Sequence, residues 1–295
     1  MRLPRVRPPA RRLVPVIAGG AAALAVAAAL AITILPIRED PAPPPVAAPP
    51  SAAAPAGWRL VWSDEFDGTA IDRRRWHVRA REGRDVDAGC NVDNPRNAFV
   101  TGGTLVLRAL RETVPCGRQT RRYSQAYLDT IGKASWTYGR FEIRAKSPNQ
   151  PHTSTGVWPA FWLRPDDSGH GEIDVTELPG GAAWSDRSTA AIFHDYAPVK
   201  QDSRVALPGG GHPGDGFHTY ATEWDATSLR WYVDGTLVWT RDRGTTPWFD
   251  EVFHKPYNIR LNLQIGGWLG EPDAQTAFPA DFVVDYVRVY QASPR

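Results

Sequence analysis

Short runs of alternating apolar and polar residues follow one another along the chain from Trp58 onward. On a strand, residues two apart share a face, so each run predicts a strand with one buried face. Inside one run, Asp234 and Gly235 form a dipeptide typical of a tight hairpin turn. We find no convincing amphipathic helix and no internal repeat. The clearest runs are TLVLRAL at 104–110, GRFEIRAK at 139–146, LRWYVDGTLVW at 229–239 and FVVDYVRVY at 282–290.

Many antiparallel strands without a helical layer predict an all-β fold. Two antiparallel sheets would pack face to face as a sandwich or jelly roll. Residues 57–295 suit one such domain, because β domains run to about 200 to 250 residues. We assign residues 1–40 to an N-terminal signal peptide or membrane anchor and residues 41–56 to a Pro/Ala-rich linker.

The N-terminal segment combines arginines with a long apolar run. Five arginines lie between residues 2 and 12, and residues 13–37 carry no charge. This run exceeds the usual signal-peptide core of about 7 to 15 residues and suffices for the roughly 20 that span a bilayer. We expect one anchor with the arginines cytoplasmic. A cleaved signal is the alternative, because small residues at 46–48 and 51–54 offer cleavage sites and Arg11 with Arg12 suggests a twin-arginine signal.

The prolines of the linker favour an extended spacer that holds the following domain away from the membrane. We therefore expect an extracellular or cell-envelope protein. There, Cys90 and Cys116 form the available intramolecular pair, closing a loop of about 25 residues and stabilising the fold by roughly 3 kcal/mol. The alternative is two separate thiols.

Charge excludes one class of partner. The chain has 34 Lys and Arg against 32 Asp and Glu, and residues after 56 have 28 against 30. This near balance argues against nucleic-acid binding, which calls for a concentrated basic face. Twelve tryptophans are consistent both with sugar-stacking surfaces and with a well-packed core. We expect a monomer.

The segment GEIDVTELPG at 171–180 is the strongest candidate for chemistry. Glu172 and Asp174 share one strand face, while Ile173 and Val175 point toward a core. Glu177 has the wrong parity for the acidic face. A single bulged residue near Val175 or Thr176 would return it there, and bulges occur preferentially beside active sites.

Crowded carboxylates on one face are unfavourable unless they serve a purpose. No Lys or Arg lies between Arg164 and Arg187 to neutralise them within the segment. The alternative reading is a solvated acidic strand. A cluster of three acids discourages simultaneous ionisation, so one proton should be retained at neutral pH, as an acid catalyst requires.

Most of residues 57–291 resembles glycoside hydrolase family sixteen, in particular laminarinase-like endo-β-1,3-glucanases. The resemblance implies a concanavalin-like β jelly roll whose concave face forms the substrate cleft, with the E-x-D-x-x-E motif on a bulged strand. It makes 57–295 the catalytic domain. The matching segments are VWSDEFDG, YSQAYLDTIGKASWTYGRFEIRAK, GVWPAFWLRP, GEIDVTE, FHTYATEWDATSLRWYVDG, NLQIGG and FVVDYVRVYQ.

The resemblance assigns roles to the three acids. It implies that Glu172 is the nucleophile, Glu177 the general acid and base, and Asp174 the residue that orients and tunes both. Retaining glycosidases place two carboxyl groups about 5 to 5.5 Å apart for this chemistry. No cofactor is required for it.

The resemblance also implies cleft residues. Trp158 resembles the family's sugar platform, while Trp162 fits the cleft or the core, and His194 fits the cleft or a structural role. His218 is expected to support structure. The remaining candidates for substrate binding are Arg144, Asn97, Asn262, Gln264 and Trp268. The GGWLG run around Trp268 looks one residue shorter than its laminarinase counterpart, which bears on substrate length.

Many relatives bind a structural calcium ion away from the cleft. The matching positions here are Glu65, Gly103 and Asp285, and oxygen ligands of this kind suit calcium. A possible structural calcium is therefore an expectation from the resemblance.

These observations predict a secreted or membrane-anchored retaining endo-β-1,3-glucanase that acts on a polysaccharide. Two alternatives stay open. One is the same chemistry on another polysaccharide, such as agarose, carrageenan or mixed-linkage glucan. The other is a non-catalytic glucan-binding lectin on the same fold, against which the intact Glu172, Asp174 and Glu177 argue.

The N-terminal assignment generates the first testable prediction. If residues 13–37 anchor the chain, the protein fractionates with membranes, and protease releases the folded domain by cutting in the Pro-rich linker. N-terminal sequencing of the released domain checks this. Protein found only in the medium, beginning between Ala42 and Gly57, would instead show a cleaved signal.

Overall fold

A computed structural model describes residues 54–83, 86–195 and 199–294. The proposed membrane segment at 13–37 and most of the linker at 41–56 lie outside these residues. Within the described ranges, none of the helices has the length and apolar character needed to cross a bilayer.

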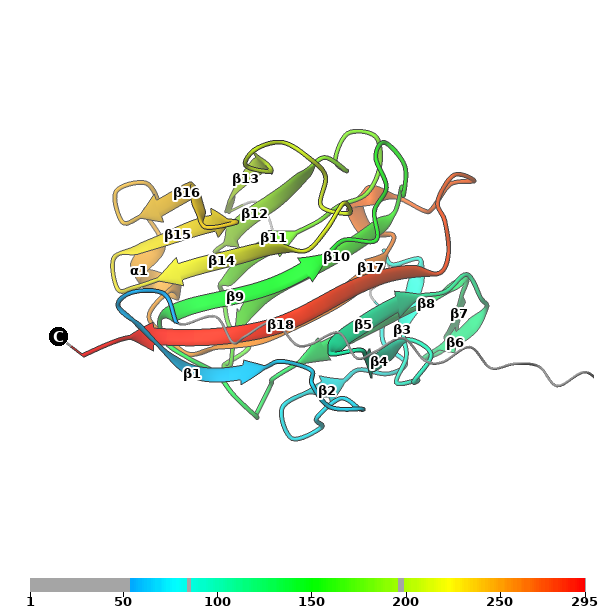
Figure 1. Ribbon diagram of the computed structural model, residues 1–295, viewed down its shortest axis with the longest axis horizontal. Coiled ribbons are helices and arrows are strands. Elements are labelled where there is room, and N and C mark those ends of the chain that lie inside the picture. The colour runs from blue at the N-terminus through cyan, green and yellow to red at the C-terminus, as the bar shows by residue number, and fades with distance from the viewer. Residues whose placement is uncertain (1–53, 84–85, 196–198, 295) are drawn as a thin grey trace, which may run out of the picture. The chain divides into compact units, whose positions relative to one another are not determined.

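Short strands make up almost all of the regular structure (Figure 1). The helical elements in the described part are α1 (Phe249–Val252) and the 3₁₀ turn η1 (Gly267–Leu269). The strands are β1 (Trp58–Asp64), β2 (His77–Val78), β3 (Gly89–Asn91), β4 (Ala98–Thr101), β5 (Thr104–Ala109), β6 (Val114–Cys116), β7 (Gln119–Arg121), β8 (Tyr123–Asp129), β9 (Gly139–Lys146), β10 (Val157–Pro165), β11 (Glu172–Glu177), β12 (Arg187–Phe193), β13 (Lys200–Ala206), β14 (His218–Trp224), β15 (Ser228–Val233), β16 (Thr236–Asp242), β17 (Tyr257–Ile265) and β18 (Ala280–Ala292).

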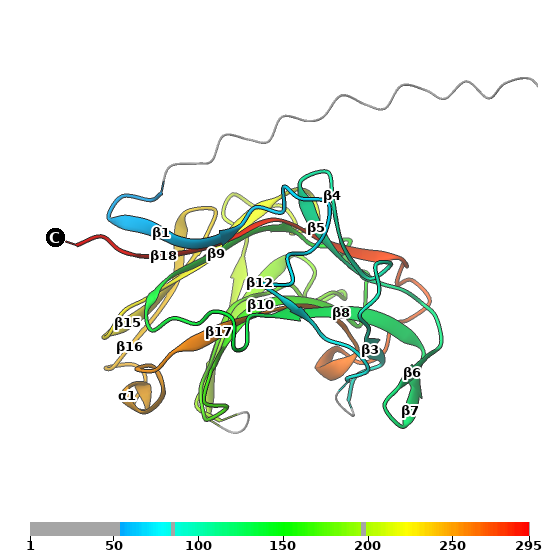
Figure 2. The same ribbon diagram turned by 90° about the horizontal axis from the view of Figure 1, so that it is seen from below.

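The described strands form two large sheets that lie one above the other (Figure 2). The first sheet has the order β16-β15-β14-β9-β18-β5-β4, with β1 paired to β18. The second has the order β13-β12-β11-β10-β17-β8-β2, with β3 paired in parallel to β8. Strands β6 and β7 form a separate hairpin. The predicted all-β sandwich of two antiparallel sheets is confirmed.

Alternation along the strands separates a core face from an outer face. On β17, Ile259, Leu261, Leu263 and Ile265 are fully buried in the core between the sheets. The residues between them on the strand point to the outer face of the second sheet. On β10 the same alternation buries Phe161 and Leu163 and turns the tryptophans of GVWPAFW outward.

The hairpin between β15 and β16 is the predicted one. Asp234 has φ 47° and Gly235 has φ 76°, so both central residues are in the left-handed region that a type I′ turn requires. Asp234 also accepts a hydrogen bond from the main-chain N–H of Thr219 and contacts His218 Nδ1 at 2.7 Å. His218 therefore has a structural partner.

The predicted bulge is present on β11. Phe161 pairs with Thr176, whereas the next residue, Trp162, pairs with Asp174, so β11 carries one extra residue there. On the other side, Asp174 faces Ala191 and Glu177 faces Thr189, two positions apart on β12 instead of three.

A bulge interrupts the hydrogen-bond ladder, and a buried carbonyl needs a donor. Trp231 of the first sheet supplies one, because its indole N–H donates to the carbonyl oxygen of Asp174 at 2.8 Å. Thr176, which the bulge turns into the core, exchanges a hydrogen bond of 2.7 Å with Ser188. The bulge is thus satisfied from both the opposite sheet and the neighbouring strand.

The Cys90–Cys116 disulfide is confirmed. It joins β3 to β6 across 26 positions of sequence. Because β3 also pairs with β8, the disulfide fixes the segment before Asn91 beside the second sheet.

Candidate active site

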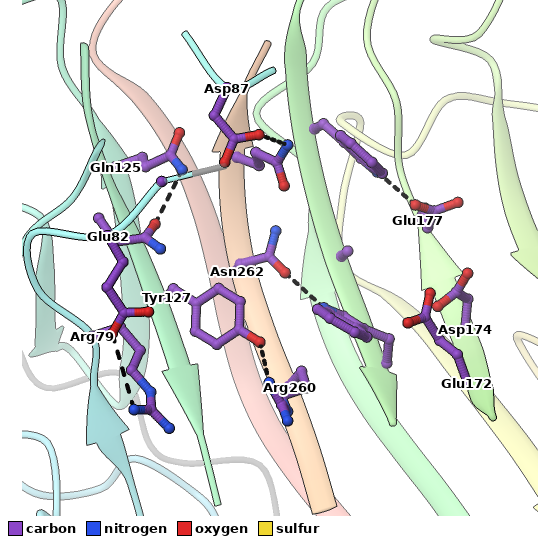
Figure 3. A pocket seen from close by; sticks show the side chains of 16 residues that line it. Arg79, Glu82, Asp87, Gln125, Tyr127, Glu172, Asp174, Glu177, Arg260 and Asn262 are labelled. Carbon is purple, nitrogen blue, oxygen red and sulfur yellow. Dashed lines mark hydrogen bonds and ion pairs between the residues drawn. The ribbon is translucent and has the colours of Figure 1, made fainter. Parts of the chain in front are cut away.

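A cavity of about 810 Å³ lies on the outer face of the second sheet (Figure 3). Its floor comes from β11, β10, β17 and β8, and its far wall comes from the segment between β2 and β3. The lining residues are Arg79, Glu82, Gly83, Asp87, Asn91, Gln125, Tyr127, Trp158, Ala160, Trp162, Glu172, Asp174, Glu177, Arg260, Asn262 and Gln264.

The three acids of GEIDVTELPG lie together at one side of this cavity (Figure 3). Because of the bulge, Glu177 faces the same way as Glu172 and Asp174. Directly opposite residues of an antiparallel pair share a face, and Ala160 and Trp162, two apart on β10, oppose Glu177 and Asp174. Glu172 and Asp174 are buried, at 7% and 4% exposed, and Glu177 is half-buried.

Glu172 has a cationic partner. Arg164 of the neighbouring strand β10 places Nη1 3.1 Å from Glu172 Oε2, and both side chains are largely buried. Along the sequence, Arg164 only marks the start of a stretch without positive charge. Strand pairing brings it back to the acids, which spacing along the chain does not show.

Glu177 accepts hydrogen bonds from two neutral donors. The indole N–H of Trp158 donates to Oε1 at 2.8 Å, and the Thr189 hydroxyl donates to Oε2 at 3.0 Å. The two partners come from the strands on either side of β11. They fix the orientation of this carboxyl without a formal positive charge in the pair.

Asp174 lies between the other two acids and is buried. Burial raises its pKa well above the usual range for an aspartate, and the nearby charges of Glu172 and Glu177 raise the pKa further. Asp174 therefore holds a proton at pH values where an exposed aspartate is ionised.

The rest of the floor is an ordered set of polar side chains. The Trp162 indole N–H donates to Asn262 Oδ1 at 2.7 Å. The Gln264 amide donates to Asp87 Oδ1 at 2.7 Å, linking β17 to the far wall. Trp158, Trp162, Asn262 and Gln264 all line the cavity, and their contact with substrate stays a prediction.

Trp268 lies beside the cavity in η1. It is 50% exposed and makes edge-to-face contacts with Trp158, at a centroid distance of 5.5 Å, and with Trp184, at 5.0 Å. It therefore extends the aromatic surface that starts at Trp158.

Three expected cleft residues lie elsewhere. Arg144 is on β9 of the first sheet, where Nη1 lies 2.6 Å from Asp285 Oδ2. Asn97 is 1% exposed and donates to the Arg108 carbonyl and the Ser124 hydroxyl, away from the cavity. Neither residue lines the cavity, because β9 belongs to the first sheet and Asn97 is buried before β4.

His194, for which the cleft and a structural role were both open, lies outside the main cavity. Phe193, not His194, opposes Glu172, so the histidine has the other parity. Its Nε2 lies 2.9 Å from Glu251 Oε2, and its ring stacks on His170 at 5.1 Å. His194 lines a separate, smaller cavity of about 250 Å³.

The expected calcium ligands have other partners. Arg288 donates to both oxygens of Glu65, at 3.0 and 2.7 Å, and Asp285 is paired with Arg144. Gly103 lies in the turn between β4 and β5. Over the described ranges, no group of three or more His, Cys, Asp or Glu side chains forms a metal cluster. With their carboxylates engaged by arginine, these residues do not present a ready cation site, and calcium binding there stays a prediction.

Sequence reasoning missed the far side of the cavity. Arg260 shares parity with Asn262 and Gln264 on β17, so that pattern offered a signal for it. Its Nη1 donates to the Tyr127 hydroxyl at 2.9 Å. Asp87 lies in irregular backbone and Asn91 in the three-residue strand β3. The sequence offered no signal for either position.

Comparison with known proteins agrees with this site. The family profile described as glycosyl hydrolases family 16 matches residues 92–288. A beta-glucanase of Rhodothermus marinus is 35% identical over 259 residues, covering 79% of this chain and 85% of the relative.

A solved structure and a relative with a different printed activity extend the comparison. The catalytic domain of an endo-1,3-beta-glucanase (laminarinase) from Thermotoga petrophila RKU-1 superposes with a TM-score of 0.72 at 32% identity, covering 80% of this chain and 99% of that one. A keratan-sulfate endo-1,4-beta-galactosidase of Sphingobacterium multivorum is 30% identical, covering 81% of this chain and 56% of the relative.

The raised pKa of Asp174 predicts how stability depends on pH. Above the unfolded value of about 3.9, the folded state keeps a proton that the unfolded state has lost, so stability falls as pH rises through the folded pKa. Asp174→Asn removes this loss. Its melting temperature relative to the parent should therefore increase with pH, as measured by thermal unfolding from about pH 4 to about pH 9.

Asp202→Asn is the matched control, because Asp202 is exposed on β13 of the same sheet. It should leave the pH dependence unchanged. A constant difference between Asp174→Asn and the parent at all pH values would show that Asp174 ionises normally.

Proposed function

The chain belongs to glycosyl hydrolase family 16, and on that premise we propose that it cleaves internal bonds of β-1,3-glucan with retention of anomeric configuration. Family membership makes the chain a glycoside hydrolase that acts within polysaccharides. The linkage, the sugar and the roles of individual residues are the proposal.

One observation carries the proposal. The bulge on β11 brings Glu172 and Glu177 to the same face of the cleft, with Asp174 between them. A retaining glycosidase needs two carboxyl groups that act on one anomeric carbon, one as nucleophile and one as acid. Binding alone needs no such cluster, which disfavours the lectin alternative.

In the first step, Glu172 attacks the anomeric carbon while Glu177 gives its proton to the leaving oxygen. The bonds from Trp158 and Thr189 hold the Glu177 carboxyl toward the cleft. In the second step, Glu177 takes a proton from water, which attacks the same carbon and releases Glu172. With Asp174 and Glu177 both protonated before the first step, Glu172 carries the single negative charge of the cluster. No cofactor takes part.

The aromatic floor supports a glucan as substrate. Trp158, Trp162 and Trp268 offer indole rings along and beside the cleft, and rings of this kind present flat apolar faces to the faces of sugars. Asn262 and Gln264 supply hydrogen-bonding groups nearby. The beta-glucanase and laminarinase relatives point the same way.

A galactan is the second candidate. The relative named as a keratan-sulfate endo-1,4-beta-galactosidase shows similarity over 81% of this chain. Arg260 in the cleft offers a cation to an acidic or sulfated sugar. Asp87 and Glu82 on the far wall oppose this, because they repel an anion.

We predict that laminarin is cleaved fastest in a panel with lichenan, agarose, carrageenan and xyloglucan. Release of reducing sugar measures each rate, and Glu172→Ala shows that the release comes from this protein. Preference for agarose or carrageenan would favour the galactan alternative. Binding of laminarin without release of sugar from any polysaccharide would favour the lectin.

Separate substitutions of the two glutamates test their roles. Glu172→Ala should lose activity on all substrates, and added azide should restore turnover of an activated aryl β-glycoside by attacking from the side that Glu172 occupied, with an α-glycosyl azide as the product. Glu177→Ala should lose polysaccharide cleavage by about 10²- to 10⁴-fold, yet form the intermediate from substrates whose leaving group needs no proton. Azide should then give a β-glycosyl azide.

Proton NMR of the first-formed products distinguishes these results. A β product from Glu172→Ala with azide would contradict the assignment. So would equal failure of both variants with activated substrates.

A further inference from the structure

Arg164 and Glu172 form an ion pair at the edge of the cleft. Their closest atoms, Nη1 and Oε2, are 3.1 Å apart, and the two side chains are 16% and 9% exposed. Charge pairs that are shielded from water interact more strongly than exposed ones, and a charge-assisted hydrogen bond is stronger than a neutral one. This bond places a guanidinium directly against the Glu172 carboxyl.

The backbone around this pair is fixed. Arg164 lies on β10 in the centre of the second sheet, and Glu172 begins β11 beside it. Gly171, just before Glu172, has φ 114°, and a side chain there would meet the Tyr257 hydroxyl at 2.0 Å. Its N–H donates to the His194 carbonyl at 3.0 Å. Glu172 therefore enters the strand from a position that only glycine allows.

Charge at Glu172 changes during the proposed reaction. When its oxygen bonds to the anomeric carbon, the carboxylate becomes a neutral ester. When water attacks in the second step, the carbon–oxygen bond to Glu172 breaks, and the electron pair returns to the carboxylate. Glu172 is thus the leaving group of the second step, and a cation beside it stabilises the charge as it develops.

We propose that Arg164 is a positioning residue that stabilises Glu172 as the leaving group and so promotes hydrolysis of the glycosyl intermediate. The inference rests on the function proposed above. The new element is that the rates of the two steps depend on Arg164 in opposite ways. In the first step the negative charge of Glu172, which Arg164 stabilises, is lost. In the second step that charge forms again.

Arg164→Met tests this, because it removes the charge and keeps a long side chain. With an activated aryl β-glycoside, the intermediate forms without help from the acid, so slower hydrolysis makes the second step limiting. We expect kcat to fall at least tenfold, KM to fall with it, and a burst of released aglycone equal to the enzyme concentration. Arg164→Lys should recover part of kcat, because it returns a cation.

Arg108→Met is the control. Arg108 also pairs with a carboxylate, through two bonds to Asp281 on the first sheet, away from the cleft. Arg108→Met should have the same kcat and KM as the parent enzyme and should show the same time course of aglycone release. Loss of activity in Arg164→Met without a burst, with KM unchanged or raised, would overturn the proposal.

A stability cycle keeps the proposal testable if Arg164→Met folds poorly. Removing one partner of a buried pair leaves the other charge without its counterpart, so Arg164→Met should lower the melting temperature less in a Glu172→Gln background. An equal loss in both backgrounds would show that Arg164 acts through packing, which overturns the proposal. Failure of the parent enzyme to cleave laminarin would contradict the assigned substrate only, since the burst is measured with the aryl glycoside of whichever sugar is cleaved.

Discussion

The extra residue on β11 is the constraint on which the site depends. Without it, Glu177 would point into the core, where an unpaired carboxylate is strongly disfavoured. With it, Thr176 enters the core and needs a polar partner, which Ser188 provides. The bulged carbonyl of Asp174 needs a donor, which Trp231 provides from the other sheet. The chemistry of the cleft therefore requires particular residues on both layers of the sandwich.

The environments of the three acids differ although their sequence spacing suggests a uniform cluster. Glu172 lies against a guanidinium, Glu177 accepts bonds from an indole and a hydroxyl, and Asp174 is buried between them with a raised pKa. Pairs of titratable groups whose surroundings separate their behaviour are how one site performs nucleophilic and acid chemistry together. The bonded partners of the two glutamates come from different positions on the neighbouring strands, with Arg164 and Trp158 on β10 and Thr189 on β12.

Local pattern predicted the strands, the Asp234–Gly235 hairpin, the disulfide and the bulge, because each depends on neighbours in sequence or on a single pair of residues. Local pattern did not predict the surroundings of a side chain where these depend on which strands pair in the sheet. Arg144, for example, lies on β9, which belongs to the first sheet and not to the sheet that carries the cavity. Arg164 was overlooked for the same reason. The far wall, with Asp87 and Asn91, depends on irregular backbone held by the Cys90–Cys116 bond.

The pairing of β1 with β18 has a practical consequence for attaching the domain to a support. Trp58 faces Ala292 and Asp64 faces Val287, so the first and last strands of the domain lie side by side in the first sheet. The cleft lies on the outer face of the second sheet, and β1 and β18 lie in the other sheet (Figure 2). A domain immobilised through either end would therefore be attached on the side of the first sheet, opposite the cleft. The cleft would then face an insoluble polysaccharide, and the attachment would not need a long flexible tether.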